Sequence, residues 1–295
     1  IMGVCVKLAS EPYTVAEIVM FRGFIGIIFI YALILQQGGT LKTKLVWQHL
    51  WRCVVGVTSL WLWFCAIALL PLATAMTLNY MAPIWISGIL FVVAWRSGKR
   101  RFEWGLVAAI FMSFAGLILL LRPSIHQEQL IGALFGLCSG VLSALAYLQV
   151  RHLGQLGESE SRVVFYFSAT GFVAGLAGCL FNAMTGGATF TLLRPHTSYG
   201  LTLLLGIGVL AAMAQMAMTR AYRLGNTLVT ANLQYTGIVF ASLWGILIWN
   251  DVLGWLSWLG IVIILASGIV ATFYNIRNTT ASKTMPPVDP IAAEL

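Results

Sequence analysis

Charged residues are scarce in this chain. Asp, Glu, Lys and Arg together make up 9% of its 295 residues, whereas hydrophobic residues make up 60%. A soluble domain of this size carries about 25% charged residues, because its surface must be polar. The composition therefore excludes a soluble enzyme domain and a disordered chain, and it indicates an integral membrane protein.

Paired cysteines and metal-ligand patterns are also missing. The five cysteines fall within apolar stretches, with no CxxC and no Cys/His cluster, so neither a disulfide framework, a metal site nor another cofactor is predicted. The net charge of +8 could suggest a nucleic-acid partner. The basic residues, however, are scattered between apolar runs, as they are in the loops of membrane proteins, and no nucleic acid is expected.

Long apolar runs are what the chain has in abundance. A membrane-spanning helix needs about 20 mostly apolar residues. Ten candidate segments follow one another: 1–9, 14–35, 50–69, 73–95, 104–121, 129–150, 162–182, 199–221, 227–248 and 255–275. The sequence predicts an all-α integral membrane protein with about ten transmembrane helices, of which the first is truncated at its N-terminus.

The basic residues are distributed unequally between the two sides of these spans. Cytoplasmic loops of membrane proteins are enriched in Lys and Arg. If the N-terminus is cytoplasmic, that side holds 13 of the 17 Lys and Arg residues: Lys42, Lys44, Arg52, Arg96, Lys99, Arg100, Arg101, Arg151, Arg162, Arg220, Arg223, Arg277 and Lys283. Both termini are therefore expected in the cytoplasm, with the protein in a bacterial inner (plasma) membrane.

The two halves of the chain resemble each other. At an offset of 154 residues, Pro71 matches Gly225, Pro83 matches Gly237 and Trp104 matches Trp258. Each half holds five spans, and an odd number inverts the second copy in the membrane, as in many secondary transporters. The expected organisation is a first repeat over 1–122, a second repeat over 129–276 and a disordered cytoplasmic tail over 277–295.

Several runs resemble helices of EamA-type carriers in the drug/metabolite transporter superfamily. These are Tyr13–Gly23 for the second helix, Ala68–Trp85 for the fourth, and Val150–Gly154 with Val164–Phe167 for the sixth and seventh. The resemblance implies two inverted five-helix repeats around a central cavity, with the fifth and tenth helices peripheral. Relatives of this kind move amino acids, other metabolites, sugars or drugs. Gly237 replaces the proline usual in the ninth helix.

Ionisable residues within a span are expensive, so they suggest function. Glu17 and Arg22 are the only ones placed clearly inside a predicted span, and we expect them to serve in coupling or gating. Arg22 could bind an anionic group of a substrate, or it could instead cap backbone carbonyls or extend to the interface. Pro83, in the middle of a span, predicts a kink that could act in gating.

Tyr80 and Gln234 match at the offset of 154 and would face one cavity across a pseudo-two-fold axis. Other candidates for the cavity lining are Asn79, Trp61, Gln215, Tyr235 and Tyr147. A ring of aromatic and amide groups without a central charge suits a neutral, zwitterionic or amphiphilic solute. The alternative is that these groups make hydrogen bonds between helices. Glycine stripes, such as Gly171 with Gly175, predict close helix packing.

The sequence thus predicts a non-enzymatic secondary transporter of a small organic solute, such as an amino acid, a metabolite or a drug-like compound. Transport would use alternating access for efflux or exchange. Its partners would be the small-molecule substrate and the lipid bilayer, and the protein would be a monomer or a weak dimer. The alternatives are a membrane-embedded transferase-type enzyme, for which no acid or His cluster is visible, and a non-transporting scaffold, for which no loop is long enough.

Overall fold

The computed structural model describes residues 2–9, 12–70, 72–96, 104–121, 130–185, 197–250 and 254–283. Within these ranges the chain is helical and contains no strand, as predicted. The helices are α1 (Met2–Ala9), α2 (Val15–Gln36), α3 (Val46–Leu69), α4 (Leu72–Asn79), α5 (Ala82–Arg96), α6 (Trp104–Leu121), α7 (Leu130–Gln155), α8 (Glu160–Met184), α9 (Ser198–Leu224), α10 (Thr227–Leu233), α11 (Thr236–Trp249) and α12 (Trp255–Lys283).

Seven of the described segments are long and apolar enough to cross a membrane. They are Val15–Gln36, Ala75–Val93, Leu130–Gln155, Glu160–Met184, Ser198–Leu224, Thr227–Ile248 and Trp255–Tyr274. Many large apolar side chains also face outward, among them Trp95, Phe181 and Leu247. An outer surface of this kind fits lipid and not water. The chain is therefore a multi-pass integral membrane protein.

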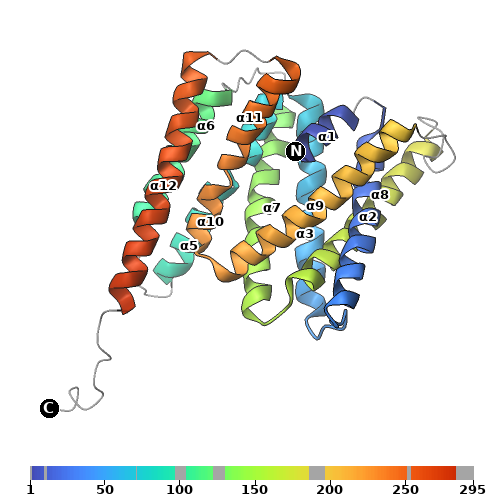
Figure 1. The fold of residues 1–295 in the computed structure, drawn as a ribbon, viewed down its shortest axis with the longest axis horizontal. Helices are drawn as coiled ribbons and strands as arrows, with labels where there is room; N and C mark the ends of the chain where they lie inside the picture. The colour runs from blue at the N-terminus through green and yellow to red at the C-terminus, as the bar shows by residue number, and fades with distance from the viewer. Residues whose placement is uncertain are drawn as a thin grey trace.

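The helices form one bundle in which segments far apart in sequence lie side by side (Figure 1). α2 packs against α8, α3 packs against α7, and α6 packs against α12. The α6–α12 pair lies at one edge of the bundle. α12 continues to Lys283, although the tail was expected to begin at residue 277. Residues 284–295 lie outside the described residues.

Two expected spans are each broken into two helices. Residues 80–81 separate α4 from α5, and residues 234–235 separate α10 from α11. Pro83 lies in the first turn of α5, where a missing N–H does no harm. The second break has no proline, and the backbone tightens there: the N–H of Gln234 donates to Ala231, and that of Tyr235 donates to Asn232. The two breaks occupy positions related by the offset of 154.

Glycines allow the backbones of α2 and α8 to touch. A Cβ atom at Gly23 would lie 2.5 Å from the backbone nitrogen of Phe172, and one at Gly175 would lie 2.5 Å from that of Met20. Of the predicted glycine stripe Gly171 and Gly175, only Gly175 makes a close helix contact, because a Cβ at Gly171 would meet nothing within 4 Å. Gly175 contacts α2, whereas Gly171 borders an internal cavity.

The connections at 37–45, 156–159 and 225–226 lie at one end of the bundle, the lower end in Figure 1. We call it the basic end, because Lys42, Lys44, Arg162 and Arg223 belong to it. Side chains tie its segments together. The Arg162 Nε donates to the carbonyl of Thr40 at 3.0 Å, and Arg223 pairs with Glu160 at 2.9 Å.

Candidate functional site

Three tyrosines and a glutamine form a polar group inside the bundle, which we call the tyrosine cluster: Tyr80, Tyr147, Tyr222 and Gln234. The rings of Tyr147 and Tyr222 are stacked, with centroids 5.3 Å apart and an interplanar angle of 10°. Gln234 Nε2 donates to the hydroxyl of Tyr222 at 2.8 Å. Tyr80 packs on the same core and interacts electrostatically with Tyr147. The structure thus brings Tyr80, Gln234 and Tyr147 together and adds Tyr222, which the sequence did not single out.

The helix breaks explain how this cluster is placed. Tyr80 stands in the break between α4 and α5, and Gln234 stands in the break between α10 and α11. Tyr147 and Tyr222 come from the continuous helices α7 and α9. A discontinuous helix frees backbone groups in the bundle interior, and such groups bind substrates in secondary transporters. The interruption of both helices beside the same cluster marks this region as a candidate site.

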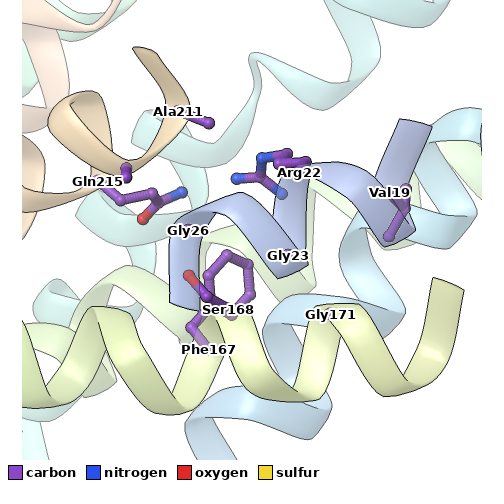
Figure 2. A pocket seen from close by; sticks show the side chains of 10 residues that line it. Val19, Arg22, Gly23, Gly26, Phe167, Ser168, Gly171, Ala211 and Gln215 are labelled. Atoms are coloured by element: carbon purple, nitrogen blue, oxygen red, sulfur yellow. The ribbon is translucent and has the colours of Figure 1, made fainter. Parts of the chain in front are cut away.

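A small cavity lies between α2, α8 and α9 (Figure 2). Arg22 borders it from α2, Gln215 from α9, and Phe167 and Ser168 from α8. The guanidinium of Arg22 and the amide of Gln215 reach toward the same space. Gly23 and Gly26 also border it. The predicted residues therefore fall into two neighbouring groups, of which one surrounds Tyr147 and the other surrounds Arg22.

Arg52 was missed as a site residue, because its place near the start of a span put it among the cytoplasmic basic residues. The structure places it inside α3, with 3% of its surface exposed. Its guanidinium carbon Cζ lies 4.5 Å from the ring centroid of Phe167, and the Cζ of Arg22 lies 5.6 Å from the same centroid. The interior therefore holds two neighbouring cations, of which the sequence analysis had placed only Arg22 there.

No carboxylate of the described residues pairs with these arginines. The acidic residues in the described ranges are Glu17, Glu158 and Glu160, and each has other partners. The two like charges are close enough to repel each other. Both guanidiniums are also within electrostatic reach of Tyr147, which links the cavity to the tyrosine cluster.

Two of the other predicted lining residues, Asn79 and Trp61, have structural partners. Asn79 Nδ2 donates to Ser139 Oγ at 2.6 Å, which ties α4 to α7. Trp61 packs in apolar clusters with Met20, Cys179 and Phe167, away from the tyrosine cluster. Tyr235 is fully buried beside Gln234, and its hydroxyl has no hydrogen-bond partner among the described residues.

Glu17 takes part in the cap of a helix. The backbone N–H of Thr14 donates to Glu17 Oε2 at 2.6 Å, and the N–H of Glu17 donates to Thr14 Oγ1 at 3.4 Å. This reciprocal pair is a capping box at the start of α2. Within the described part of the chain, no group of three or more His, Cys, Asp or Glu residues could hold a metal ion.

A further cluster lies at the basic end and was not predicted. Glu158 accepts hydrogen bonds from Thr43 Oγ1 and Arg162 Nη1, each at 2.6 Å, and His49 Nε2 lies 3.4 Å from its carboxylate. Burial raises the pKa of the Glu158 carboxyl, but the hydrogen bonds from Thr43 and Arg162, the charge of Arg162 and the nearby His49 outweigh it. The pKa therefore lies below its ordinary value.

A bundle of lipid-facing helices with an internal polar and cationic site belongs to the class of membrane transport proteins. Comparison with known proteins supports this class. The chain is 32% identical to the pseudopaline exporter CntI of Pseudomonas aeruginosa over 271 residues, which cover 91% of this chain and 90% of the exporter. The chain belongs to the family of this exporter.

Two further comparisons fit this assignment. The chain is 25% identical to an uncharacterised transporter of Helicobacter pylori over 282 residues, which cover 92% of this chain and 89% of that protein. A crystal structure with 21% sequence identity superposes with a TM-score of 0.72 and covers 90% of both chains, so the fold is one already observed. No model of a known protein family matches the chain.

Proposed function

We propose that this protein is a secondary transporter that exports or exchanges a small organic solute by alternating access, through a site between Tyr80 and Gln234. The observation that carries the proposal is the pair of helix breaks at 80–81 and 234–235, which flank one tyrosine cluster. Such breaks, at corresponding places in two halves, are the usual substrate sites of secondary transporters. Kinship to a named exporter supports the direction of transport.

The proposed architecture is ten spans in two inverted repeats, with α4–α5 and α10–α11 each counted as one span. Residues related by a pseudo-two-fold axis can contact each other only near that axis. Ser113 and Ser267, 154 positions apart, are hydrogen-bonded to each other. Related helix pairs also recur: α3 packs on α7 as α9 packs on α1, and α2 packs on α9 as α8 packs on α3. These contacts support the repeat.

The basic end would face the cytoplasm, and α12 ends on that side (Figure 1). The unequal distribution of Lys and Arg between the two sides supports this orientation, since cytoplasmic loops are enriched in these residues. The membrane would be the inner membrane of a bacterium. No observation favours an enzyme or a scaffold, and the kinship to named transporters speaks against both.

The Tyr80→Ala/Gln234→Ala double variant tests the proposed site. Pseudopaline is the first compound to assay, because a relative exports it. Loss of an aromatic surface and of the hydrogen bond to Tyr222, together about 2 kcal/mol, should lower transport at limiting solute roughly thirtyfold. Solute flux into proteoliposomes measures it, with a wider metabolite panel as the second arm.

The control for this experiment is Tyr199→Ala/Gln37→Ala, which makes the same chemical changes at exposed positions. It should transport like the wild type. Undiminished transport by the Tyr80→Ala/Gln234→Ala variant would remove the proposed site.

A further inference from the structure

We propose that Arg22 and Arg52 together bind the carboxylate of an organic anion, so that the transported solute is anionic. The inference rests on the proposed transport function and specifies its substrate class. The sequence had instead suggested a neutral, zwitterionic or amphiphilic solute, because it placed no charged side chain at the centre of the site.

Arg52 carries the first part of the argument. It is buried, yet its Nε and Nη1 atoms have no hydrogen-bond partner among the described residues. The side chain folds back over Gly56, and a Cβ atom at that position would collide with Nη1. The ring of Phe167 also packs against the guanidinium. An arginine anchoring its own fold would donate to carbonyls or a carboxylate, whereas these donors are held in place and left unused.

Arg22 supplies a second cation near the ring of Phe167. It borders the cavity that also contains Gln215 and Ser168 (Figure 2). The three acidic residues of the described ranges are engaged in a helix cap, in the Thr43–His49–Arg162 contacts and in the pair with Arg223. Two positive charges therefore lie near one ring, Phe167, which borders the cavity together with Arg22, and no carboxylate of the described residues pairs with either charge.

The chemistry of these groups selects the ligand. The planar fork of a guanidinium matches a carboxylate in a bidentate hydrogen-bonded pair, and in a buried site such pairs are strong. The ring of Tyr147 is within electrostatic reach of both arginines, and its stack with Tyr222 offers a surface for an organic body. An anion that satisfies the arginines and packs on these rings is an organic carboxylate.

The test uses the purified full chain in detergent and measures its melting temperature. Succinate, citrate and glutamate serve as probes, with succinamide as the neutral control and sodium chloride holding the ionic strength constant. The wild type should gain stability in a concentration-dependent way with one or more of the carboxylates but not with succinamide. Arg22→Gln and Arg52→Gln should each lose this gain, whereas Arg96→Gln, at an exposed position, should keep it.

The unliganded Arg52→Gln variant supplies a second readout. A buried cation without a partner destabilises the empty protein, so its removal should raise the melting temperature by roughly 3 °C while abolishing the carboxylate effect. A fall in the melting temperature of this variant would mean that Arg52 anchors the fold, and it would overturn the inference.

Three other results would also overturn the inference. One is the absence of any carboxylate effect on the wild type. Another is a carboxylate effect that survives in both arginine variants. The third is an equal effect of inorganic phosphate or phosphatidylglycerol, lost in the same variants, which would assign the site to those anions. Proteoliposomes separate this failure from failure of the proposed function, since solute flux that persists in both arginine variants would leave the transporter intact and remove only the anion site.

Discussion

The Gly175→Leu variant is expected to yield no folded transporter. A Cβ at this position would lie 2.5 Å from the nitrogen and 2.7 Å from the Cα of Met20. These are backbone atoms of α2, which cannot rotate away as a side chain can, so α2 and α8 would have to separate. Helix association within a membrane depends on such close packing. The cost should exceed the roughly 1–3 kcal/mol typical of an overfilled core.

Size-exclusion profiles and melting temperatures of the detergent-purified variants measure this effect. Gly171→Ala is the matched control for stability on the same helix, since its new Cβ meets nothing within 4 Å. Its melting temperature should equal or slightly exceed that of the wild type, because alanine favours the helix by about 1 kcal/mol over glycine. A monodisperse Gly175→Leu protein with the wild-type melting temperature would contradict the contact between α2 and α8.

The second large effect is expected from Glu158→Gln. The carboxylate accepts from Thr43 and Arg162 and faces His49, so it joins the connection between α2 and α3 to the start of α8. Removing its charge leaves Arg162 and His49 facing a neutral amide. Hydrogen bonds to charged groups contribute about 1.5–3 kcal/mol each. The variant should lose about 2 kcal/mol of stability and melt roughly 4 °C lower.

The same residue predicts a dependence on pH. The pKa of Glu158 in the folded protein lies below its ordinary value of 4.5. Its contribution to stability is therefore complete above pH 4.5 and is lost as the pH falls through the folded-state pKa. Melting temperatures measured between about pH 3 and 7 should converge for the wild type and Glu158→Gln at the acidic end.

Glu160→Gln is the control for both measurements. Glu160 pairs with Arg223, but both side chains are partly exposed, and pairs of this kind contribute at most about 1 kcal/mol. Its melting temperature should stay close to that of the wild type at every pH. An equal effect of the two substitutions on the melting temperature would mean that the cluster around Glu158 stabilises the fold no more than an exposed ion pair does.

Much of the fold follows from sequence patterns that depend on single elements. Apolar runs predicted the helices and the membrane, because hydrocarbon admits few structures other than helices with internally satisfied backbones. The break near Tyr80 could be anticipated from Pro83, which cannot continue the ladder of a helix. The break beside Gln234 could not, since it contains no proline and Gly237 alone is compatible with an unbroken helix. The only sequence signal for this second break was the match of Gln234 to Tyr80 at the offset of 154.

Only some residues of the candidate site could be predicted from the sequence. Tyr80, Gln234 and Tyr147 were named, and they lie together. Trp61 was named on its residue type, and it packs among apolar side chains instead. Tyr222 was missed because a tyrosine near the end of a span reads as an interface anchor. The available sequence signal was its spacing of 12 residues from Gln234, which is ambiguous across a helix break.

The sequence by itself determined that this chain is a multi-pass membrane protein with helical spans and few charges, since these properties depend on composition and on the length of apolar runs. Only the tertiary structure decided that Arg52 turns inward and shares Phe167 with Arg22. An arginine near the end of a span can extend to the interface or fold into the bundle. Which of these occurs depends on the space above Gly56 and on a ring supplied by α8, more than 100 residues away.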